Sequence, residues 1–468
     1  MKTEPTANRQ LDKALDIGSR LELFVDDYLI ESMRELDLKL HSPQPAGKVL
    51  TLDAPWEGVT CDYHVVFKDD DRYRMYYRGT SHEGYVIPSL LNPGETKVPE
   101  HAEFACYAES QDGIAWTKPP LGLNTFNGST DNSIVWTGEG AHNFAPFKDT
   151  NPDCAPEARY KAVGSAGRGL YGFKSADGVR WSLLSDKPII TDGKFDSLNV
   201  AFWDSLRRRY MAFYRDFRGV RDIKTATSDD FLHWTAGQWI DHGGAPKEHL
   251  YTNGTVAYFR APHIFLAFPR RMLPNRQFHS DAPWPGLSDG LFMSSRDGVH
   301  WDRRFRQAFI RPGRDPRNWV SRTNLASCGI VPTGDDELSM YVLRNRDFPT
   351  CYIERVVLRT DGFVSVHADG QPGEMVTRPL IFEGGNLVIN YATSAAGSIR
   401  VELQGTAGDA IEGFALSESA EIYGDEIERI VTWSSGKDVS KLAGKPIRLR
   451  FVIVDADVYS LRFQCATV

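Results

Sequence analysis

The sequence contains no apolar run of the roughly 18 residues that would span a bilayer. Residues 1–20 contain no apolar core, so we expect no signal peptide and a cytoplasmic protein. Removal of a leader would instead make it periplasmic or secreted. The six cysteines lie far apart with no CxxC pair, which favours reduced core residues over a zinc site or a disulfide framework.

Several motifs of nucleotide, metal and hydrolase chemistry are absent. There is no HExxH, EF-hand loop, GxxxxGK[ST], GxGxxG or GxSxG pattern, which argues against NTPases, dinucleotide enzymes and serine hydrolases. We predict no cofactor, although motifs of this kind would not reveal a Ca²⁺ in a central channel. A net charge of -8 argues against nucleic acid or an anionic membrane as a partner. The sequence does not indicate an oligomeric state.

Aromatic residues are abundant, at 12% of the chain, while long helical periodicity is nearly missing. This composition suits an all-β core, and it also suits stacking against the apolar faces of sugar rings.

A repeated turn organises the chain. The pattern S-x-D-G-x-x-W is complete at residues 110–116, 175–181 and 295–301, degenerate at 228–234, and reduced to its turn at 360–363. The copies recur at intervals of roughly 60 residues, and Asp-Gly supplies the positive-φ turn of a hairpin whose tryptophan packs on the outgoing strand. A second strand pair precedes most copies.

Two hairpins in each repeat would form a four-stranded blade. The predicted fold is therefore all-β, a five-bladed β-propeller over residues 1–373. Alternating strands continue over residues 374–468 without the repeated turn, which predicts a C-terminal β-sandwich. The alternative for the larger part is a β-sandwich with similar hairpins.

Three carboxylates each precede an apolar strand in a different repeat: Asp62, Asp196 and Glu248. If each points into the channel, the three converge on one small volume. Such a cluster can supply a nucleophile or base, a general acid and a stabiliser of an oxocarbenium-like transition state. The alternative role for each is a strand-end cap or a solvated edge.

Other polar and aromatic residues near the starts and ends of these strands are candidates for substrate binding. Arginine and histidine can hold sugar hydroxyls, a carboxylate, a sulfate or a phosphate, while aromatic rings can stack on sugars. The candidates are Trp56, Tyr63, His142, Asn143, Arg215, His249, Arg270, Arg322 and Asn324.

The first repeat resembles that of the family 32 glycoside hydrolases, the invertase and levanase group. Asp62, Tyr73 and residues 75–78 fall at the spacings of that family. The resemblance implies that Asp62 matches the nucleophile, Asp196 the second acid and Glu248 the acid/base. The Asp-Pro-Asn-Gly, Arg-Asp-Pro and Glu-Cys signatures are altered here, so the chain resembles the wider five-bladed clan that includes families 43, 117 and 130.

We therefore expect an enzyme of carbohydrate metabolism, a glycoside hydrolase that removes a terminal sugar from an oligo- or polysaccharide. Asp62 would be the nucleophile or base, Glu248 the general acid and Asp196 the stabiliser. Three alternatives remain open. They are a glycoside phosphorylase with an arginine-lined phosphate site, a sialidase-like enzyme, and a non-catalytic carbohydrate-binding propeller.

Overall fold

The computed structural model describes residues 14–82, 86–92, 95, 99–165, 167 and 169–465. Strands make up 48% of the structure and helices 3%, which confirms the predicted all-β class. No helix within these ranges is both long and apolar enough to cross a membrane. The helices are short 3-10 turns at Pro88–Leu90, Ala141–Asn143, Pro156–Ala158, Pro316–Asn318 and Ser440–Leu442.

The chain divides into two compact units. One spans residues 42–358, and the other joins the segment ending at His41 to the segment that begins at Arg359. This division differs from the predicted one, which placed residues 1–373 in the first domain and 374–468 in the second. The reason is strand pairing, because β29 (Val364–Ala368) hydrogen-bonds to both β4 (Asp37–Leu40) and β34 (Arg448–Gln464).

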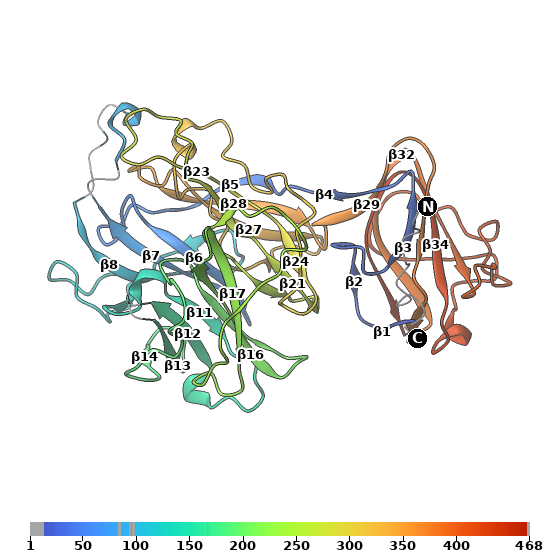
Figure 1. The fold of residues 1–468 in the computed structure, drawn as a ribbon, viewed down its shortest axis with the longest axis horizontal. Helices are drawn as coiled ribbons and strands as arrows, with labels where there is room; N and C mark the ends of the chain where they lie inside the picture. Colours follow the sequence, from blue (N-terminus) through green and yellow to red (C-terminus); the bar gives the residue numbers. More distant parts are fainter. Residues whose placement is uncertain are drawn as a thin grey trace, which may run out of the picture. The chain divides into compact units, whose positions relative to one another are not determined.

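The described residues of the 42–358 unit form five antiparallel sheets and one small additional sheet (Figure 1). The first sheet contains β6 (Asp62–Asp69), β7 (Arg72–Ser81), β8 (His101–Ser110), β9 (Trp116–Thr117) and β10 (Ile134–Thr137). The second contains β11 (Ala145–Lys148), β12 (Tyr160–Ser165), β13 (Leu170–Ser175) and β14 (Ser182–Leu183). The third contains β15 (Val200–Asp204), β16 (Arg209–Phe217), β17 (Arg221–Ser228) and β18 (Gln238–Trp239).

The fourth sheet contains β20 (Val256–Tyr258), β21 (Ala261–Ala267), β24 (Met293–Ser295) and β25 (Trp301–Asp302). The additional sheet contains β19 (His249–Leu250), β22 (Arg270–Leu273) and β23 (Leu287–Gly290). The fifth contains β26 (Val331–Pro332), β27 (Glu337–Arg344), β28 (Tyr352–Arg359) and β5 (Gln44–Thr51). Strand β5 begins the unit but lies beside β28 at its end (Figure 1), so hydrogen bonds join the two ends.

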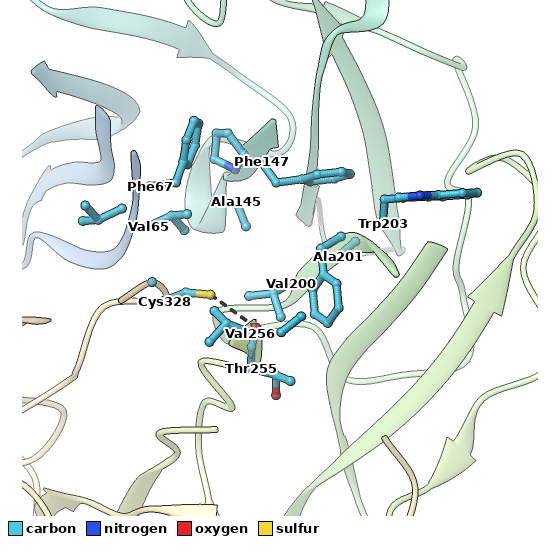
Figure 2. A pocket seen from close by; sticks show the side chains of 15 residues that line it. Val65, Phe67, Ala145, Phe147, Val200, Ala201, Trp203, Thr255, Val256 and Cys328 are labelled. Carbon is cyan, nitrogen blue, oxygen red and sulfur yellow. Dashed lines mark hydrogen bonds between the residues drawn. The ribbon is translucent and has the colours of Figure 1, made fainter. Parts of the chain in front are cut away.

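One edge of each of the five sheets borders a common apolar pocket of about 220 Å³ (Figure 2). The pocket is lined from the five sheets in turn by Val65, Ala145, Val200, Val256 and Cys328, the last lying just before β26. The first and last sheets also meet directly, because the backbone N–H of Val66 donates to the Cys328 carbonyl at 2.8 Å. The five sheets therefore share a centre.

The repeated turns have one geometry. In the copy at 175–181, Ser175 Oγ accepts from the Gly178 N–H at 2.9 Å, and Asp177 Oδ1 accepts from the next two N–H groups at 2.8 and 2.7 Å. Gly178 has a φ of +78°, which confirms the predicted positive-φ turn. The same position is held by Gly113, Phe231 and Gly298 at +73°, +68° and +82°.

The tryptophans of these turns pack between sheets, and the prediction that they pack on their own strand is incomplete. Trp181 of the second sheet meets the ring of Tyr76 of the first at 6.2 Å and 83°. The Tyr76 hydroxyl also donates to the Gly178 carbonyl at 2.7 Å. Trp116 of the first sheet makes the same edge contact with Tyr341 of the fifth, at 5.4 Å and 90°. Each turn therefore fastens its sheet to the neighbouring one.

The second unit is built on one large sheet and a parallel pair. The sheet contains β2 (Glu22–Leu23), β3 (Ile30–Arg34), β4, β29, β30 (Gly373–Thr377), β32 (Asn386–Gln404), β33 (Asp425–Ile430) and β34. The pair is β1 (Leu15–Gly18) with β31 (Leu380–Phe382). Its core is a separate apolar cluster, in which the rings of Phe382 and Phe463 stack at 3.7 Å.

Alanine substitution at two glycines should separate backbone strain from crowding. We expect Gly122→Ala to cost about 1–2 kcal/mol, because the site has a φ of +69° but open space around a new Cβ. Gly178→Ala should cost about 1–3 kcal/mol more, because its Cβ would lie 2.8 Å from Arg74 Nη1 and 3.0 Å from the Tyr76 hydroxyl. Urea unfolding measures both losses, and equal losses would contradict the fastening role of this turn.

Candidate active site

A polar, open cavity of about 550 Å³ lies among the first three sheets. Its lining includes Glu103 on β8, His142 in the 3-10 turn before β11, Asp196 before β15 and Arg215 on β16. Each side chain comes from a strand or a strand end, so the sheet framework holds their relative positions.

Three of these residues form a hydrogen-bonded chain. His142 Nδ1 lies 2.8 Å from Glu103 Oε1, and His142 Nε2 lies 3.1 Å from Asp196 Oδ1. Burial lowers the pKa of His142, but the hydrogen bonds to Asp196 and Glu103 outweigh it and hold the pKa above its ordinary value. The two carboxylates therefore favour the protonated form of the imidazole. Glu103 was not among the predicted residues, because nothing in its strand sequence marks it.

Asp196 is open to the cavity, with 65% of its side chain exposed. The hydroxyls of Tyr63 and Tyr251 lie 3.4 and 3.3 Å from its Oδ1, and Arg215 Nη2 lies 3.8 Å from its Oδ2. Partial burial raises the pKa of Asp196, but His142 and Arg215 lower it by more, to well below the ordinary value. Asp196 is thus an ionised carboxylate facing an open cavity.

Asp62 lies beneath this group and is 1% exposed. Arg270 Nη1 lies 3.4 Å from its Oδ1, and Arg346 Nε lies 3.2 Å from its Oδ2. Burial raises the pKa of Asp62, but the charges of Arg270, Arg346 and Arg78 lower it below its ordinary value. The next residue, Tyr63, has a φ of +58° at a β-bulge, and such strain is typical of functional sites.

Asp347 is a second buried carboxyl of this cluster that sequence reasoning missed. Its Oδ1 accepts from Arg346 Nη1 at 2.7 Å, so Asp62 and Asp347 share one guanidinium. Burial raises the pKa of Asp347 to about 6, against the lowering charges of Arg346 and Arg322. A sequence signal was available, because Arg346-Asp347-Phe348 matches the Arg-Asp-Phe of residues 215–217 at the end of β16.

The arginines of the site come from equivalent places. Arg78, Arg215, Arg270 and Arg346 lie at or near the strand ends of four different sheets, and all are buried. Arg78 lies 4.8 Å from the centre of the Tyr63 ring, while Arg270 and Arg215 lie 4.8 and 5.2 Å from that of Tyr251. Aromatic faces stabilise guanidinium groups in such positions.

Two predicted binding residues have their amide groups occupied by other contacts within the structure. The Asn143 amide donates to the carbonyls of Phe195 and Ser197, and its oxygen accepts from the Ser165 N–H. Asn324 Nδ2 donates to two backbone carbonyls, at 2.9 and 3.0 Å, and its Oδ1 accepts from Arg344. Both residues are at most 1% exposed. They hold the strand ends in place.

Glu248 is not brought into this cluster. Its carboxylate pairs with Arg271 at 3.2 Å, with Arg306 at 3.4 Å and with Arg303. Successive side chains of a strand point to opposite faces. Because Arg270 contacts Asp62, its neighbour Arg271 holds Glu248 on the other side of β22.

The remaining candidates lie around the cluster. His249 Nδ1 accepts from the Arg221 backbone N–H at 3.2 Å. Trp56 is half-buried, and its Nε1 donates to Ser133 Oγ at 3.3 Å, a contact that does not involve the carboxylates. The Arg322 guanidinium lies 5.9 Å from the centre of the Trp284 ring, and its charge contributes to the low pKa of Asp196. Within the described ranges, no group of three or more His, Cys, Asp or Glu side chains is arranged to hold a metal ion.

Comparisons with known proteins identify structural resemblances only. No family model matches the chain, and no curated protein matches it. Solved structures that resemble it include glycoside-hydrolase-like propeller enzymes.

Three of these structures illustrate the range. A glycoside hydrolase is 13% identical with a TM-score of 0.48, covering 68% of this chain and 92% of its own. A family 43 arabinoxylan arabinofuranohydrolase from Bacillus subtilis is 12% identical with a TM-score of 0.41, covering 88% and 96%. A β-1,2-mannobiose phosphorylase from Listeria innocua is 11% identical with a TM-score of 0.41, covering 69% and 97%.

Neutralising Asp62 should destabilise the fold strongly. We expect Asp62→Asn to lower the free energy of unfolding by about 3–5 kcal/mol, because it leaves Arg270 and Arg346 buried without their shared counter-charge. Asp71→Asn is the control, since its carboxylate is 76% exposed and its loss should cost at most about 1 kcal/mol. Denaturant unfolding of the two variants tests this, and similar losses would rule out a stabilising role for the buried pair.

Proposed function

We propose that the protein is a glycoside hydrolase that cleaves a terminal sugar in the polar cavity. The observation that carries this proposal is the chain Glu103–His142–Asp196 along the cavity wall. It places His142, whose protonated form is favoured, beside the ionised carboxylate of Asp196. Glycosidic bond cleavage uses one group that donates a proton and one carboxylate that acts as nucleophile or base. A volume of about 550 Å³ lies in the range typical of small-molecule sites.

In this proposal Asp196 acts as the base or nucleophile and His142 as the proton donor. As the substrate enters, the 3.1 Å hydrogen bond between His142 Nε2 and Asp196 Oδ1 opens, so that Nε2 can protonate the glycosidic oxygen while Asp196 attacks the anomeric carbon or takes a proton from the attacking water. Glu103 orients the imidazole and supports its charge. These roles differ from the expected ones, because Asp62 is 1% exposed and Glu248 pairs with arginines on the other face of β22.

We also propose that the five sheets around the common apolar pocket are the blades of a five-bladed β-propeller. The five edges that line one pocket and the pairing of β5 with β28 support this reading. For the second unit we propose a β-sandwich, supported by its separate apolar core.

Loss of the Asp196 charge should abolish turnover while the protein stays folded. We expect Asp196→Asn to lower kcat/KM at least ~100-fold on the best substrate of an aryl-glycoside panel, since positioned acid–base groups contribute about 10²–10⁴-fold. The control is Glu139→Gln, a carboxylate that lines the same cavity outside the hydrogen-bonded chain. Equal activity of the two variants would exclude Asp196 as the reacting group. A protein that binds sugars but turns over no glycoside would instead be a carbohydrate-binding module.

The pH dependence should report the proton on His142. Its pKa lies above the ordinary value of about 6.5, so kcat/KM should fall as the pH rises through this raised pKa and the donor loses its proton. Glu103→Gln removes one of the two interactions that raise the pKa, so the alkaline limb should move to lower pH. His142→Gln should remove that limb, and a limb unchanged in both variants would assign the proton donor to another group.

A further inference from the structure

The guanidiniums of two arginines, Arg215 and Arg221, interact with the Asp196 carboxylate. Arg215 lies at its Oδ2, and both Arg221 and Arg322 lie near enough for their charges to interact with it. Arg270 and Arg346 are matched to Asp62 and Asp347, and Arg78 lies close to Glu103, at 3.6 Å. Asp196 is therefore a carboxylate whose charge acts on both Arg215 and Arg221.

Tyr251 holds two of these arginines on one side of the cluster. The guanidiniums of Arg215 and Arg221 lie 5.2 and 5.5 Å from the centre of its ring. Within the described ranges no carboxylate pairs with Arg221, whose guanidinium instead lies 3.3 Å from His249 Nδ1. Burial and the charge of Arg221 lower the pKa of His249, and an imidazole supplies no negative charge to Arg221 in either protonation state.

This arrangement costs free energy in the unliganded protein. Burial lowers the pKa of Arg221, and the neighbouring charges of Arg215 and Arg322 lower it further, while Tyr251 and Asp196 compensate only in part. Guanidiniums gathered without equal negative charge favour the binding of planar or tetrahedral oxyanions, which accept several N–H bonds at once.

We propose that Arg215 and Arg221, which lie against the same Tyr251 ring, form a binding site for an oxyanion next to Asp196. The oxyanion is a carboxylate or sulfate on the sugar itself, or an inorganic phosphate that enters the reaction with it. This inference rests on the proposed function for its place in a reaction, but the binding site can be tested without turnover. If the bound anion is part of the sugar, the substrate is an acidic saccharide. If it is inorganic phosphate, phosphate is a co-substrate.

Equilibrium binding tests the site directly. Glucuronic acid, inorganic sulfate and inorganic phosphate are titrated into the protein by calorimetry, with glucose as the neutral counterpart of the uronate. We expect at least one of the three anions to bind. If the sugar carries the charge, glucose should bind at least tenfold more weakly than glucuronic acid. Arg221→Gln should weaken anion binding at least tenfold. Arg180→Gln is the control, an exposed arginine paired with Asp177 outside the site.

Stability distinguishes a binding role of Arg221 from a structural one. Because Arg221 lies among like charges without a paired carboxylate, Arg221→Gln should leave the melting temperature unchanged or raise it. A lower melting temperature together with unchanged anion affinity would overturn the proposal. So would the absence of binding by all three anions at millimolar concentration.

Turnover identifies the source of the anion. A rate on neutral aryl glycosides that appears only with added phosphate assigns the site to phosphate as co-substrate. Hydrolysis of an aryl uronide or sulfated glycoside, without phosphate and in preference to its neutral analogue, assigns it to the sugar. Anion binding without turnover of any glycoside would contradict the hydrolase proposal and leave the oxyanion site standing.

Discussion

The site depends on one buried carboxylate, Asp62, and on the two guanidiniums that it neutralises. Asp62 belongs to β6, Arg270 to β22, and Arg346 follows β27, so the three charges join segments far apart in the sequence. Removing charged groups from water costs free energy, and the attraction between the charges offsets this cost only when the partners are held in place. The repeated turns supply that placement, because their tryptophans and carbonyls fasten each sheet to its neighbour. With this cluster fixed, Arg270 lies against Tyr251, Arg346 holds Asp347, and Asp196 sits above them at the cavity.

The need to pair buried polar groups also explains why so many polar side chains at the strand ends have structural roles. The amides of Asn143, Asn199, Asn253 and Asn324 bond to backbone groups of neighbouring segments, and all four are almost fully buried. Burying a polar group without a partner costs more free energy of folding than a typical hydrogen bond contributes. The amides therefore satisfy carbonyls that the converging strand ends would otherwise leave unpaired. Residues that remain open to the cavity, such as Asp196 and Glu103, are those from which chemistry is expected.

The sequence predicted the all-β class and the turns, because an Asp-Gly turn and its tryptophan are encoded within seven residues. It also predicted that Asp62 and Asp196 lie near each other, and in the structure the hydroxyl of Tyr63, the residue after Asp62, lies 3.4 Å from Asp196 Oδ1. It did not predict that Glu248 faces another set of arginines, because the alternation of β22 that separates Arg270 from Arg271 needs the register of that strand. Nor did it identify Glu103 and Asp347, whose importance comes from partners on other sheets. The use of β5 in the fifth sheet was missed for the same reason, since the pairing spans the whole unit.

The proton donor and the arginine cluster are electrostatically coupled. Arg78 lowers the pKa of His142, and the arginines around Asp196 act in the same direction on any cation near them. An oxyanion bound by Arg215 and Arg221, as proposed, would offset that positive field, so the imidazolium of His142 would become easier to maintain. Linkage makes the effect reciprocal, and a protonated His142 in turn favours the bound anion. An acidic saccharide would thus increase the fraction of His142 that carries the proton for the glycosidic oxygen, whereas a neutral sugar would meet the same residues with the donor more easily deprotonated. If Asp196 is the reacting carboxylate, as proposed, this coupling gives a physical reason for gathering guanidiniums beside it at a cost in stability.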